Sequence, residues 1–296
     1  MSMSRQISNV NFVNSMISDK FEIYHVKDVV DNAHTLYHYH DFYEIHATLS
    51  GNANFYLDGK QFEIEAGSVL LIQKNDLHRI VSQSSKVFDR IYIFITPEFL
   101  RKFSTPETDL ENCFKGLDTS SSKVLKVNPE KLKEYLAFVD EKETRTYGAD
   151  IEYQQKLIEY IIFLNRLVLS SNFESEPINN KKNKYIDAIL EYINENLDKS
   201  LSLDEMEKQF FVSKYYISRE FKKYTGLTFH QYVQKKKLLY AKKLLVQYQN
   251  STDVYQKCGF KSYAHFLKVF KKEFQLTPKQ YLEKEEKKQK VYYQND

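Results

Sequence analysis

The spacing of apolar residues divides the chain into a part with the period of strands and parts with the period of helices. Between residues 21 and 95, short apolar or alternating runs are separated by turn residues, which is typical of β-strands. We expect strands at Phe21–Val26, Phe42–Leu49, Asn54–Leu57, Phe62–Glu65, Val69–Gln73 and Phe88–Ile95. Asp58-Gly59 between the third and fourth strands favours a tight hairpin turn, because that turn needs positive φ. Short, closely spaced strands predict a sandwich or a small barrel.

From Pro129 to about Ser171 the apolar residues recur with the spacing of a helix. One stripe consists of Leu157, Ile161, Leu164 and Val168, and a second consists of Ile158, Ile162 and Leu169. A helix that packs only against a barrel needs one such stripe. The second stripe either packs against neighbouring segments of the chain or pairs with a second copy of it. The polar segment that follows, 171–183, contains Pro177 and is predicted to be an exposed linker.

The C-terminal part contains an internal repeat with an offset of 49 residues. The first copy contains Ser213, Ile217, Phe221, Lys222, Lys223, Leu227, Thr228 and Tyr232. The second copy contains Ser262, Phe266, Phe270, Lys271, Lys272, Leu276, Thr277 and Tyr281. In each copy a serine side chain can cap the start of a helix, and two apolar residues four positions apart bury one side of it.

Each predicted capped helix follows a shorter helix and a tight turn. The shorter helices are expected at Leu203–Gln209 and at Ser251–Lys257. This arrangement is a helix-turn-helix, whose second helix enters the major groove of DNA. Thr228 to Tyr248 reads as one continuous helix between the two units, about 30 Å long at 1.5 Å per residue. Two readers one turn of DNA apart need about 34 Å, so this helix has a suitable length to separate them.

Polar side chains lie opposite the apolar stripe on each capped helix, and they are the candidates for contacts with DNA. The first helix offers Tyr215, Ser218, Arg219 and Lys222. On the second helix the small Ala264 shares this face with Lys268 and Lys271, and Tyr263 and His265 flank it. Arginine suits a bidentate contact with guanine, whereas lysines more often meet phosphate. A single outward polar residue is usually just solvated, so it is the repeated arrangement that favours DNA binding.

Charge and composition are consistent with this interpretation. A length of 296 residues allows two domains. Residues 184–296 contain roughly 22 Lys and Arg against 14 Asp and Glu, about +8, which leaves about −5 for the rest. The two cysteines, Cys113 and Cys258, are too few and too far apart for a disulfide framework or a cysteine metal site. We find no signal peptide or membrane span and therefore expect a cytoplasmic protein.

Residues 185–282 resemble the DNA-binding domain of the AraC/XylS family. The supporting stretches are LSLDEMEKQFFVSKYYISREFKKYTGLTFHQYV and CGFKSYAHFLKVFKKEFQLTPKQYL. The resemblance implies that Tyr215, Ser218 and Arg219 contact bases in the first unit, and Tyr263, Ala264, His265 and Lys268 in the second. Three positions depart from the family pattern, which has alanine, alanine and glycine where this chain has Glu207, Tyr255 and Gln275. We expect looser or reshaped packing there, and base reading that relies on Arg219, His265 and Lys268.

The N-terminal part resembles the two motifs of cupin barrels. The first is His38-x-His40-x3-Glu44-x6-Gly51, and the second runs from Gly67 to His78. In cupins such histidines and a glutamate converge on a metal, and imidazole and carboxylate ligands suit a divalent transition metal. The alternative is that His38, His40, Glu44 and His78 bind an effector, for which the resemblance favours a sugar or related metabolite. Gln73 and Asn75 replace the proline and glycine of the second motif, so we expect no resident cofactor.

Together these patterns predict an α+β protein of two domains. The first, at 1–170, is a cupin-like β-barrel with a helical segment for effector binding and dimerisation, and the linker 171–183 follows it. The second, at 184–284, is an all-α AraC-type domain with two helix-turn-helix units, before a polar tail at 285–296. The expected function is transcription regulation without enzymatic activity, with promoter DNA, a small-molecule effector, a second copy and RNA polymerase as partners. The rivals are a metal-dependent cupin enzyme and a DNA-binding protein whose barrel serves only dimerisation.

Overall fold

The computed structural model consists of two compact units, residues 1–180 and residues 181–296. It describes residues 16–29, 37–57, 60–82, 87–115, 124–140, 146–170 and 184–293. The predicted hairpin turn at Asp58-Gly59 and the predicted linker at 171–183 lie outside the described residues. Each unit is compact on its own, as expected for a chain with two cores.

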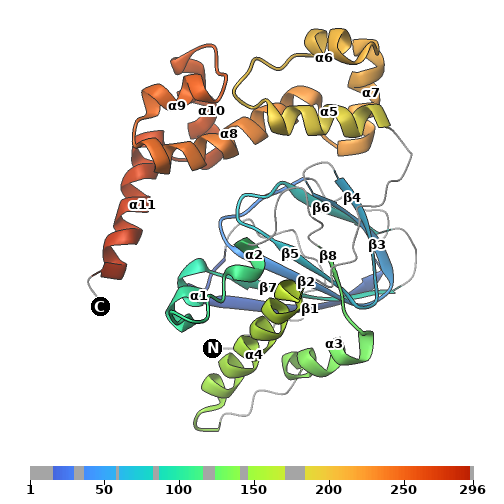
Figure 1. The fold of residues 1–296 in the computed structure, drawn as a ribbon, viewed down its shortest axis with the longest axis vertical. Helices are drawn as coiled ribbons and strands as arrows, with labels where there is room; N and C mark the ends of the chain where they lie inside the picture. Colours follow the sequence, from blue (N-terminus) through green and yellow to red (C-terminus); the bar gives the residue numbers. More distant parts are fainter. Residues whose placement is uncertain are drawn as a thin grey trace. The chain divides into compact units, whose positions relative to one another are not determined.

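The described part of the first unit is built on eight strands (Figure 1). They are β1 (Phe21–Val29), β2 (Tyr43–Ser50), β3 (Asn52–Leu57), β4 (Lys60–Glu65), β5 (Ser68–Ile72), β6 (His78–Ser82), β7 (Val87–Ile95) and β8 (Val124–Lys126). The six strands predicted from the sequence are confirmed, with ends that differ by up to three residues. The sequence interpretation did not include β6 and β8.

All strand pairs are antiparallel, and the strands form two sheets. One sheet has the order β1-β7-β2-β5-β8, and the other has the order β4-β3-β6. Successive side chains of a strand point to opposite faces, so the larger sheet separates two cores. On β7, Phe88, Tyr92 and Phe94 pack with the smaller sheet in the barrel interior. Ile91 and Ile93 belong to the core on the opposite face.

Helices cover that opposite face of the larger sheet (Figure 1). They are α1 (Pro97–Phe103), α2 (Asn112–Lys115), α3 (Pro129–Leu136), the 3-10 helix η1 (Ala137–Asp140) and α4 (Ala149–Leu169). The first predicted stripe of α4 is buried at Leu157, Ile161 and Leu164. Ile158 and Ile162 of the second stripe are only half-buried, and Leu169 is 67% exposed. The segment therefore folds as separate helices, the longest of which keeps an apolar strip at its surface.

The described part of the second unit is entirely helical (Figure 1). Its helices are α5 (Lys184–Glu195), α6 (Leu203–Phe210), α7 (Lys214–Thr225), α8 (Phe229–Tyr248), α9 (Ser251–Lys257), α10 (Tyr263–Phe274) and α11 (Pro278–Tyr293). The two predicted helix-turn-helix units are α6–α7 and α9–α10. Helix α11 continues to Tyr293, so the backbone is helical through most of the segment predicted to be a tail.

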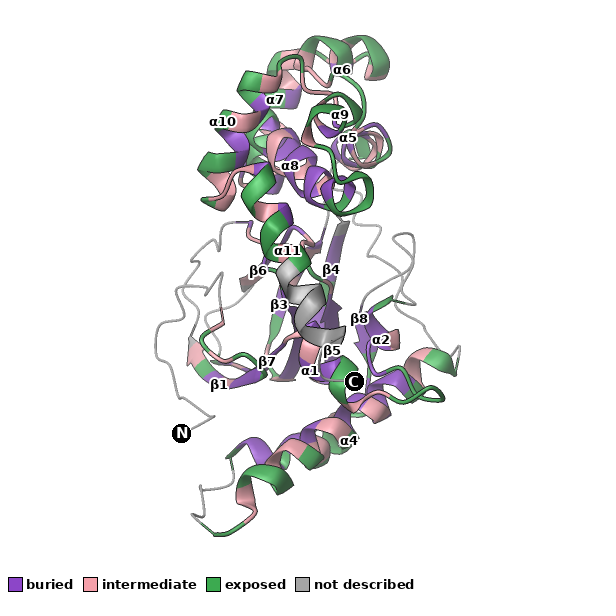
Figure 2. Ribbon diagram, turned by 90° about the vertical axis from the view of Figure 1, so that its left-hand side faces the viewer, coloured by how far each residue is buried: buried purple, intermediate pink, exposed green. Residues whose placement is uncertain are grey.

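Helix α8 is a shared support for both helix-turn-helix units, and it is buried along much of its length (Figure 2). At its start, the rings of Phe229 and Tyr232 pack against Phe221 of α7. Near its end, Leu244 and Leu245 belong to the core that also buries Phe266 and Phe270 of α10. One continuous helix therefore joins the two helix-turn-helix units. None of the described helices combines the length and the apolar content that crossing a bilayer requires.

Candidate functional site

The first helix-turn-helix unit presents the predicted polar face to solvent. The Ser213 hydroxyl caps α7 by accepting a hydrogen bond from the backbone N–H of Tyr216 at 3.4 Å. Ile217 and Phe221 are completely buried, as the repeat predicted. On the other side of α7 the four predicted contact residues are all exposed: Tyr215, Ser218, Arg219 and Lys222. The helix therefore offers one uninterrupted polar face.

The second unit repeats this construction with one difference. Ser262 caps α10 by accepting a hydrogen bond from the backbone N–H of His265, and Ala264, His265 and Lys268 are all exposed. Tyr263 is instead half-buried, and its hydroxyl lies 2.9 Å from the hydroxyl of Ser251 at the start of α9. Tyr263 therefore lies in the contact between α9 and α10, at the edge of the exposed face of α10.

The three departures from the family pattern have local structural roles. The Glu207 carboxylate accepts a hydrogen bond from the backbone N–H of Lys214 at 3.0 Å, and so joins α6 to the first residue of α7. The ring of Tyr255 lies 5.4 Å from that of Tyr263, centroid to centroid. Gln275 ends α10 with φ of 58°, the left-handed conformation that a glycine would favour. Each of the three residues therefore has a defined local contact or backbone conformation, and the expected change in packing relative to the family stays a prediction.

Two features near the first polar face were not predicted. The guanidinium of Arg219 forms an ion pair with Glu220, with 3.0 Å between Nε and Oε1, while its side chain stays 73% exposed. Phe211 lies in the turn between α6 and α7 with φ of 54°, and it is 94% exposed. An exposed phenylalanine in the turn carries no periodic signal, so the sequence pattern did not select it.

The four residues that the cupin resemblance selected in the first unit come together. Nε2 of His40 donates to the Glu44 carboxylate at 2.8 Å, and Nε2 of His78 lies 3.4 Å from the same oxygen. The ring centroids of His38 and His78 are 4.2 Å apart. His38 pairs with His78 through an isolated bridge, and both His38 and His40 precede β2. His38 and His40 thus lie outside any regular strand, and their side chains still converge with Glu44 and His78.

The residues of this cluster shift one another's pKa values. Burial raises the pKa of Glu44, but hydrogen bonds from His40 and His78 outweigh burial and hold it well below its ordinary value. Burial lowers the pKa of His78, but the Glu44 carboxylate outweighs that effect and raises it. The Glu44 carboxylate and the charged form of His78 therefore stabilise one another in the barrel interior.

The same residues also fit a divalent transition metal in part. His38, Glu44 and His78 each offer a ligand atom, and these atoms all lie within 4.8 Å of one another. Nδ1 of His78 faces the carbonyl oxygen of Asp76 at 2.9 Å, which leaves Nε2 as the ligand atom. Both ring nitrogens of His40 already face protein oxygens, the Phe42 carbonyl and the Glu44 carboxylate, so neither nitrogen is directed at a metal position. The structure therefore offers three donors for a metal.

Further along β2, two buried polar residues continue the face that carries Glu44. His46 and Thr48 are completely buried, and the ring of His46 lies 4.8 Å from that of Tyr92 on β7. Thr48 lies opposite Arg90 in the pairing of β2 with β7. Motif searching missed them, although alternate positions 44, 46 and 48 are polar in an otherwise apolar strand. That alternation was the available signal.

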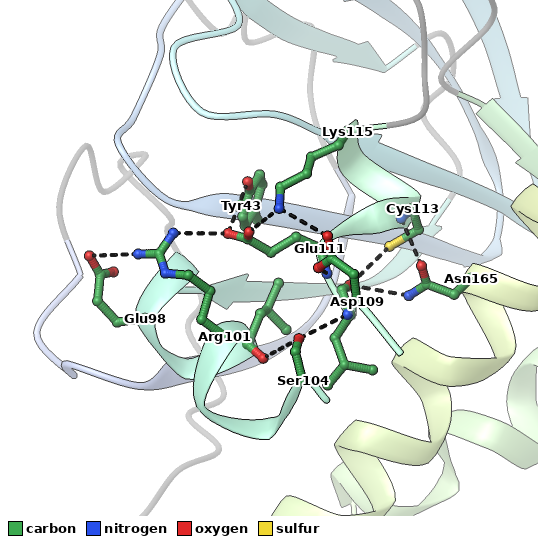
Figure 3. A network of polar contacts seen from close by, with 11 residues as sticks. Tyr43, Glu98, Arg101, Ser104, Asp109, Glu111, Cys113, Lys115 and Asn165 are labelled. Atoms are coloured by element: carbon green, nitrogen blue, oxygen red, sulfur yellow. Dashed lines mark hydrogen bonds and ion pairs between the residues drawn. The ribbon is translucent and has the colours of Figure 1, made fainter. Parts of the chain in front are cut away.

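A polar network joins β2 to α2 and α4 on the outer face of the same sheet (Figure 3). Glu111 is buried, accepts from the Tyr43 hydroxyl at 3.3 Å and pairs with Arg101. Burial and Glu111 raise the pKa of Tyr43, which keeps the hydroxyl protonated. Asn165 of α4 accepts from the backbone N–H of Cys113 of α2 at 2.8 Å. The strand that carries the interior polar residues is thus connected to the helix with the exposed apolar strip.

Two protein families match the chain, one in each unit. Residues 23–137 match the family described as AraC-like ligand binding domain. Residues 206–284 match the family described as helix-turn-helix domain. The two matched ranges together cover more than half of the chain, and they coincide with the barrel and with both helix-turn-helix units.

Several known proteins match most of the chain. The HTH-type transcriptional activator RhaS of Klebsiella pneumoniae is 24% identical over 245 residues, which cover 82% of this chain and 85% of the relative. RhaS of Salmonella arizonae is 25% identical over 246 residues, with the same coverage. The crystal structure of ToxT from Vibrio cholerae covers 90% of this chain and 98% of its own, at 15% identity and a TM-score of 0.35. The chain therefore belongs to the AraC family of transcription regulators, with an N-terminal ligand-binding domain and a C-terminal DNA-binding helix-turn-helix domain.

Proposed function

We propose that this regulator is a cytoplasmic homodimer in which a small molecule, bound inside the barrel, changes how two DNA-binding units occupy a promoter. The observation that carries the DNA-binding part is the pair of serine-capped helices, both supported by α8. Effector control requires that the effector prefers one of two arrangements of the protein, since a ligand with equal affinity for both shifts nothing. RNA polymerase is a further proposed partner.

The proposed base contacts are made by the outward residues of α7 and α10. Arg219, His265 and Lys268 carry the hydrogen-bonding groups, with Tyr215 and Ser218 beside Arg219. Lys222 is assigned to phosphate, and Ala264 to contact with a thymine methyl group. Tyr263 is assigned a supporting role through its contact with Ser251.

Dimerisation is assigned to the apolar strip on α4, with a second copy of the chain as its occupant. Ile151, Ile158, Ile162 and Leu169 lie within about 20° of one line along a helix with 100° per residue. Ile151 and Leu169 are 66% and 67% exposed at its two ends. Spacings of seven and four residues are those of a helix that pairs with a second helix. The same helix carries Asn165, so the network of Figure 3 provides a connected route from β2 to this surface.

The proposal assigns no enzymatic activity and no resident cofactor to the protein. The effector class proposed from the resemblance is a sugar or a related metabolite. A metal-dependent cupin enzyme is the rival, supported by the three donors His38, Glu44 and His78. When bound there, a metal would supply Lewis acidity, and the three residues would hold it. Elemental analysis and activity assays of the unchanged protein, His78→Ala and His40→Ala separate the two. Stoichiometric metal and turnover in the unchanged protein, both lost in His78→Ala, would favour the enzyme.

The main test of the proposal is promoter binding by full-length protein with and without candidate effectors. We expect an effector to change either DNA affinity or transcription from the bound promoter. Identical affinity and identical transcription in its presence and absence, for an effector shown to bind the protein, would contradict effector control. The remaining alternative, a barrel used only for dimerisation, predicts that no metabolite in a broad panel shifts the melting temperature.

A further inference from the structure

On β2, two buried side chains that face the barrel interior lack hydrogen-bond partners among the described protein atoms. Both ring nitrogens of His46 and the hydroxyl of Thr48 are unpaired, and both residues are completely buried. They lie two positions apart on β2, so they share the interior face with Glu44. Buried polar groups are nearly always paired, because leaving one unpaired costs the free energy of its lost hydration. Three such atoms on one face indicate a place built for polar groups from outside the chain.

The chemistry of these atoms is neutral and mixed. The His46 ring is completely buried, and neither of its nitrogens has a partner among the described protein atoms, so a charged ring would be buried without a counter-charge and the uncharged form is favoured. An uncharged imidazole has one nitrogen that donates and one that accepts, and a hydroxyl does both. The pair therefore matches a ligand that carries neighbouring groups able to donate and to accept, such as adjacent hydroxyl groups.

The charges around the pair are already compensated. The Arg90 guanidinium donates to the Asp28 carboxylate at 2.7 Å and to the Tyr92 hydroxyl at 3.0 Å. On the other side, the Glu44 carboxylate is paired with His40 and lies 3.4 Å from His78. A charged ligand group beside His46 would lose hydration without gaining an uncommitted counter-charge. The surroundings therefore favour an uncharged ligand.

Aromatic rings border the same place. The ring centroid of Phe88 lies 6.0 Å from that of His46 in a stacked arrangement, and the Tyr92 ring meets His46 edge-on. Phe94 packs in the same interior core. Apolar rings around a few polar atoms are the usual lining of a small-molecule site, because the rings bury carbon while the polar atoms fix orientation.

We propose that His46 and Thr48 are the polar anchors of the effector site, and that they select a small uncharged ligand with neighbouring hydroxyl groups. The proposal rests on the proposed function and moves the ligand contacts away from the cluster selected by the sequence. His40 and Glu44 already satisfy one another, whereas His46 and Thr48 do not have partners within the described protein. Thr48→Val and His46→Leu each remove unpaired polar atoms, so the fold itself has no need of them.

The test uses full-length protein without DNA and a panel of neutral aldoses and alditols, together with the aldonic acids of the same carbon number. Melting temperature screens the panel, and calorimetric titration gives the affinity. We expect at least one neutral compound to bind and the matching acid to bind at least about tenfold more weakly. Thr48→Val and His46→Leu should each lower affinity for that compound by about tenfold or more, with an unchanged or higher melting temperature before ligand is added.

Tyr160→Phe is the matched control, because the Tyr160 hydroxyl is also buried and unpaired but belongs to the core outside the barrel interior. It should keep the affinity of the unchanged protein. Failure of every neutral compound to bind, tighter binding of the acid, or unchanged affinity in both Thr48→Val and His46→Leu would overturn the inference. If these variants lose the ligand while the ligand leaves promoter binding and transcription unchanged, the proposed effector control fails and the binding site stands.

Discussion

The side chain of Lys237 on α8 donates a hydrogen bond to the carbonyl oxygen of Gly259, 2.9 Å from its Nζ. It also donates to the carbonyl oxygen of Lys199, which precedes α6. Lys237 is only 5% exposed, and burial lowers its pKa. Gly259 lies in the turn between α9 and α10, so one lysine on the supporting helix joins the segment just before the first helix-turn-helix unit to the turn of the second. This contact fixes the orientation of one unit relative to the other.

Replacing Lys237 with Met should therefore weaken DNA binding by both helix-turn-helix units together more than DNA binding by one unit alone. We expect a larger loss of affinity for duplexes with both subsites than for duplexes with the first subsite alone. Two carbonyl oxygens lose a charged donor, for which about 1.5 to 3 kcal/mol per hydrogen bond is typical. Fluorescence anisotropy with the two duplexes measures the difference. Lys243→Met on an exposed part of α8 is the control, and equal losses on both duplexes would refute the role of Lys237.

Gly259 should not tolerate a side chain. Its φ is +63°, and a Cβ would lie 2.5 Å from both the Lys199 carbonyl oxygen and Nζ of Lys237. We expect Gly259→Ala to lower the free energy of unfolding of the C-terminal domain by about 1 to 3 kcal/mol, because the new side chain strains the backbone and displaces Lys237. Urea unfolding followed by circular dichroism measures this change, and Gly148→Ala is the comparison. Gly148 also has positive φ, of 87°, but has no atom near a built Cβ, so an equal loss there would assign the effect to φ alone.

Arg219 and Lys222 should differ in the kind of affinity they supply. Arg219→Ala is expected to relax preference at one base position by about 1 to 3 kcal/mol, because a bidentate contact with a base is lost. Lys222→Ala should weaken binding evenly across sequences and reduce the slope of log affinity against log salt by about 1. Selection from a randomised duplex library gives the preference profile. An unchanged profile for Arg219→Ala would show that another residue reads that base.

The parts of the fold that could be predicted are those whose signal is local. Ser213 and Ser262 were recognised as caps because a serine followed by an apolar pair four residues apart is a short-range pattern. Strand β6 was missed because Arg79 interrupts its apolar run, and the fold buries that arginine between the rings of Tyr37 and Tyr56. Strand β8 has three residues and exists only through its pairing with β5. Such partners come from distant segments, which periodicity does not reveal.

In the candidate sites, too, local patterns could be predicted from the sequence, whereas contacts between distant segments could not. His38, His40, Glu44 and His78 share a recognisable spacing, and they converge. His46 and Thr48 do not belong to a motif, and their lack of partners is a property of the three-dimensional surroundings. Tyr263 has the position of an outward residue in the repeat, but a hydroxyl on the neighbouring helix draws it into the helix contact. A spacing therefore identified which residues meet, but not which polar atoms remain unpaired.

The apolar strip on α4 predicts a dimer that charge can disrupt. Replacing both Ile151 and Leu169 with Glu should convert a dimer to a monomer, because two carboxylates would be buried in the interface without partners. Both side chains are exposed in the single chain, so its folding should be unaffected. Sedimentation equilibrium gives the mass. The control is Tyr147→Glu, which changes an exposed aromatic residue outside the strip and should leave the protein dimeric. A dimer that survives the double change would exclude this surface.

His25 should make the stability of the N-terminal domain, residues 1–180, depend on pH. Burial opposes its charged form, but hydrogen bonds from the ring to Asp140 and Asp89, each 2.7 Å long, outweigh burial and raise its pKa above 6.5. The charged form is thus favoured by folding, so its contribution is complete below the unfolded pKa and is lost as pH rises through the folded pKa. Relative to His25→Gln, we expect an advantage below about 1 kcal/mol at pH 6 that shrinks by pH 8. An advantage that grows with pH in urea unfolding would contradict this sign.

The central claim is that α7 and α10, held by one supporting helix, read the sequence of double-stranded DNA. The most direct measurement is a titration of full-length protein, at moderate salt, against a duplex selected from a random library and against a shuffled duplex of the same composition. We predict at least about a thousandfold preference for the selected duplex, largely abolished by Arg219→Ala combined with Lys268→Ala. Equal affinity for the selected and shuffled duplexes would contradict the claim.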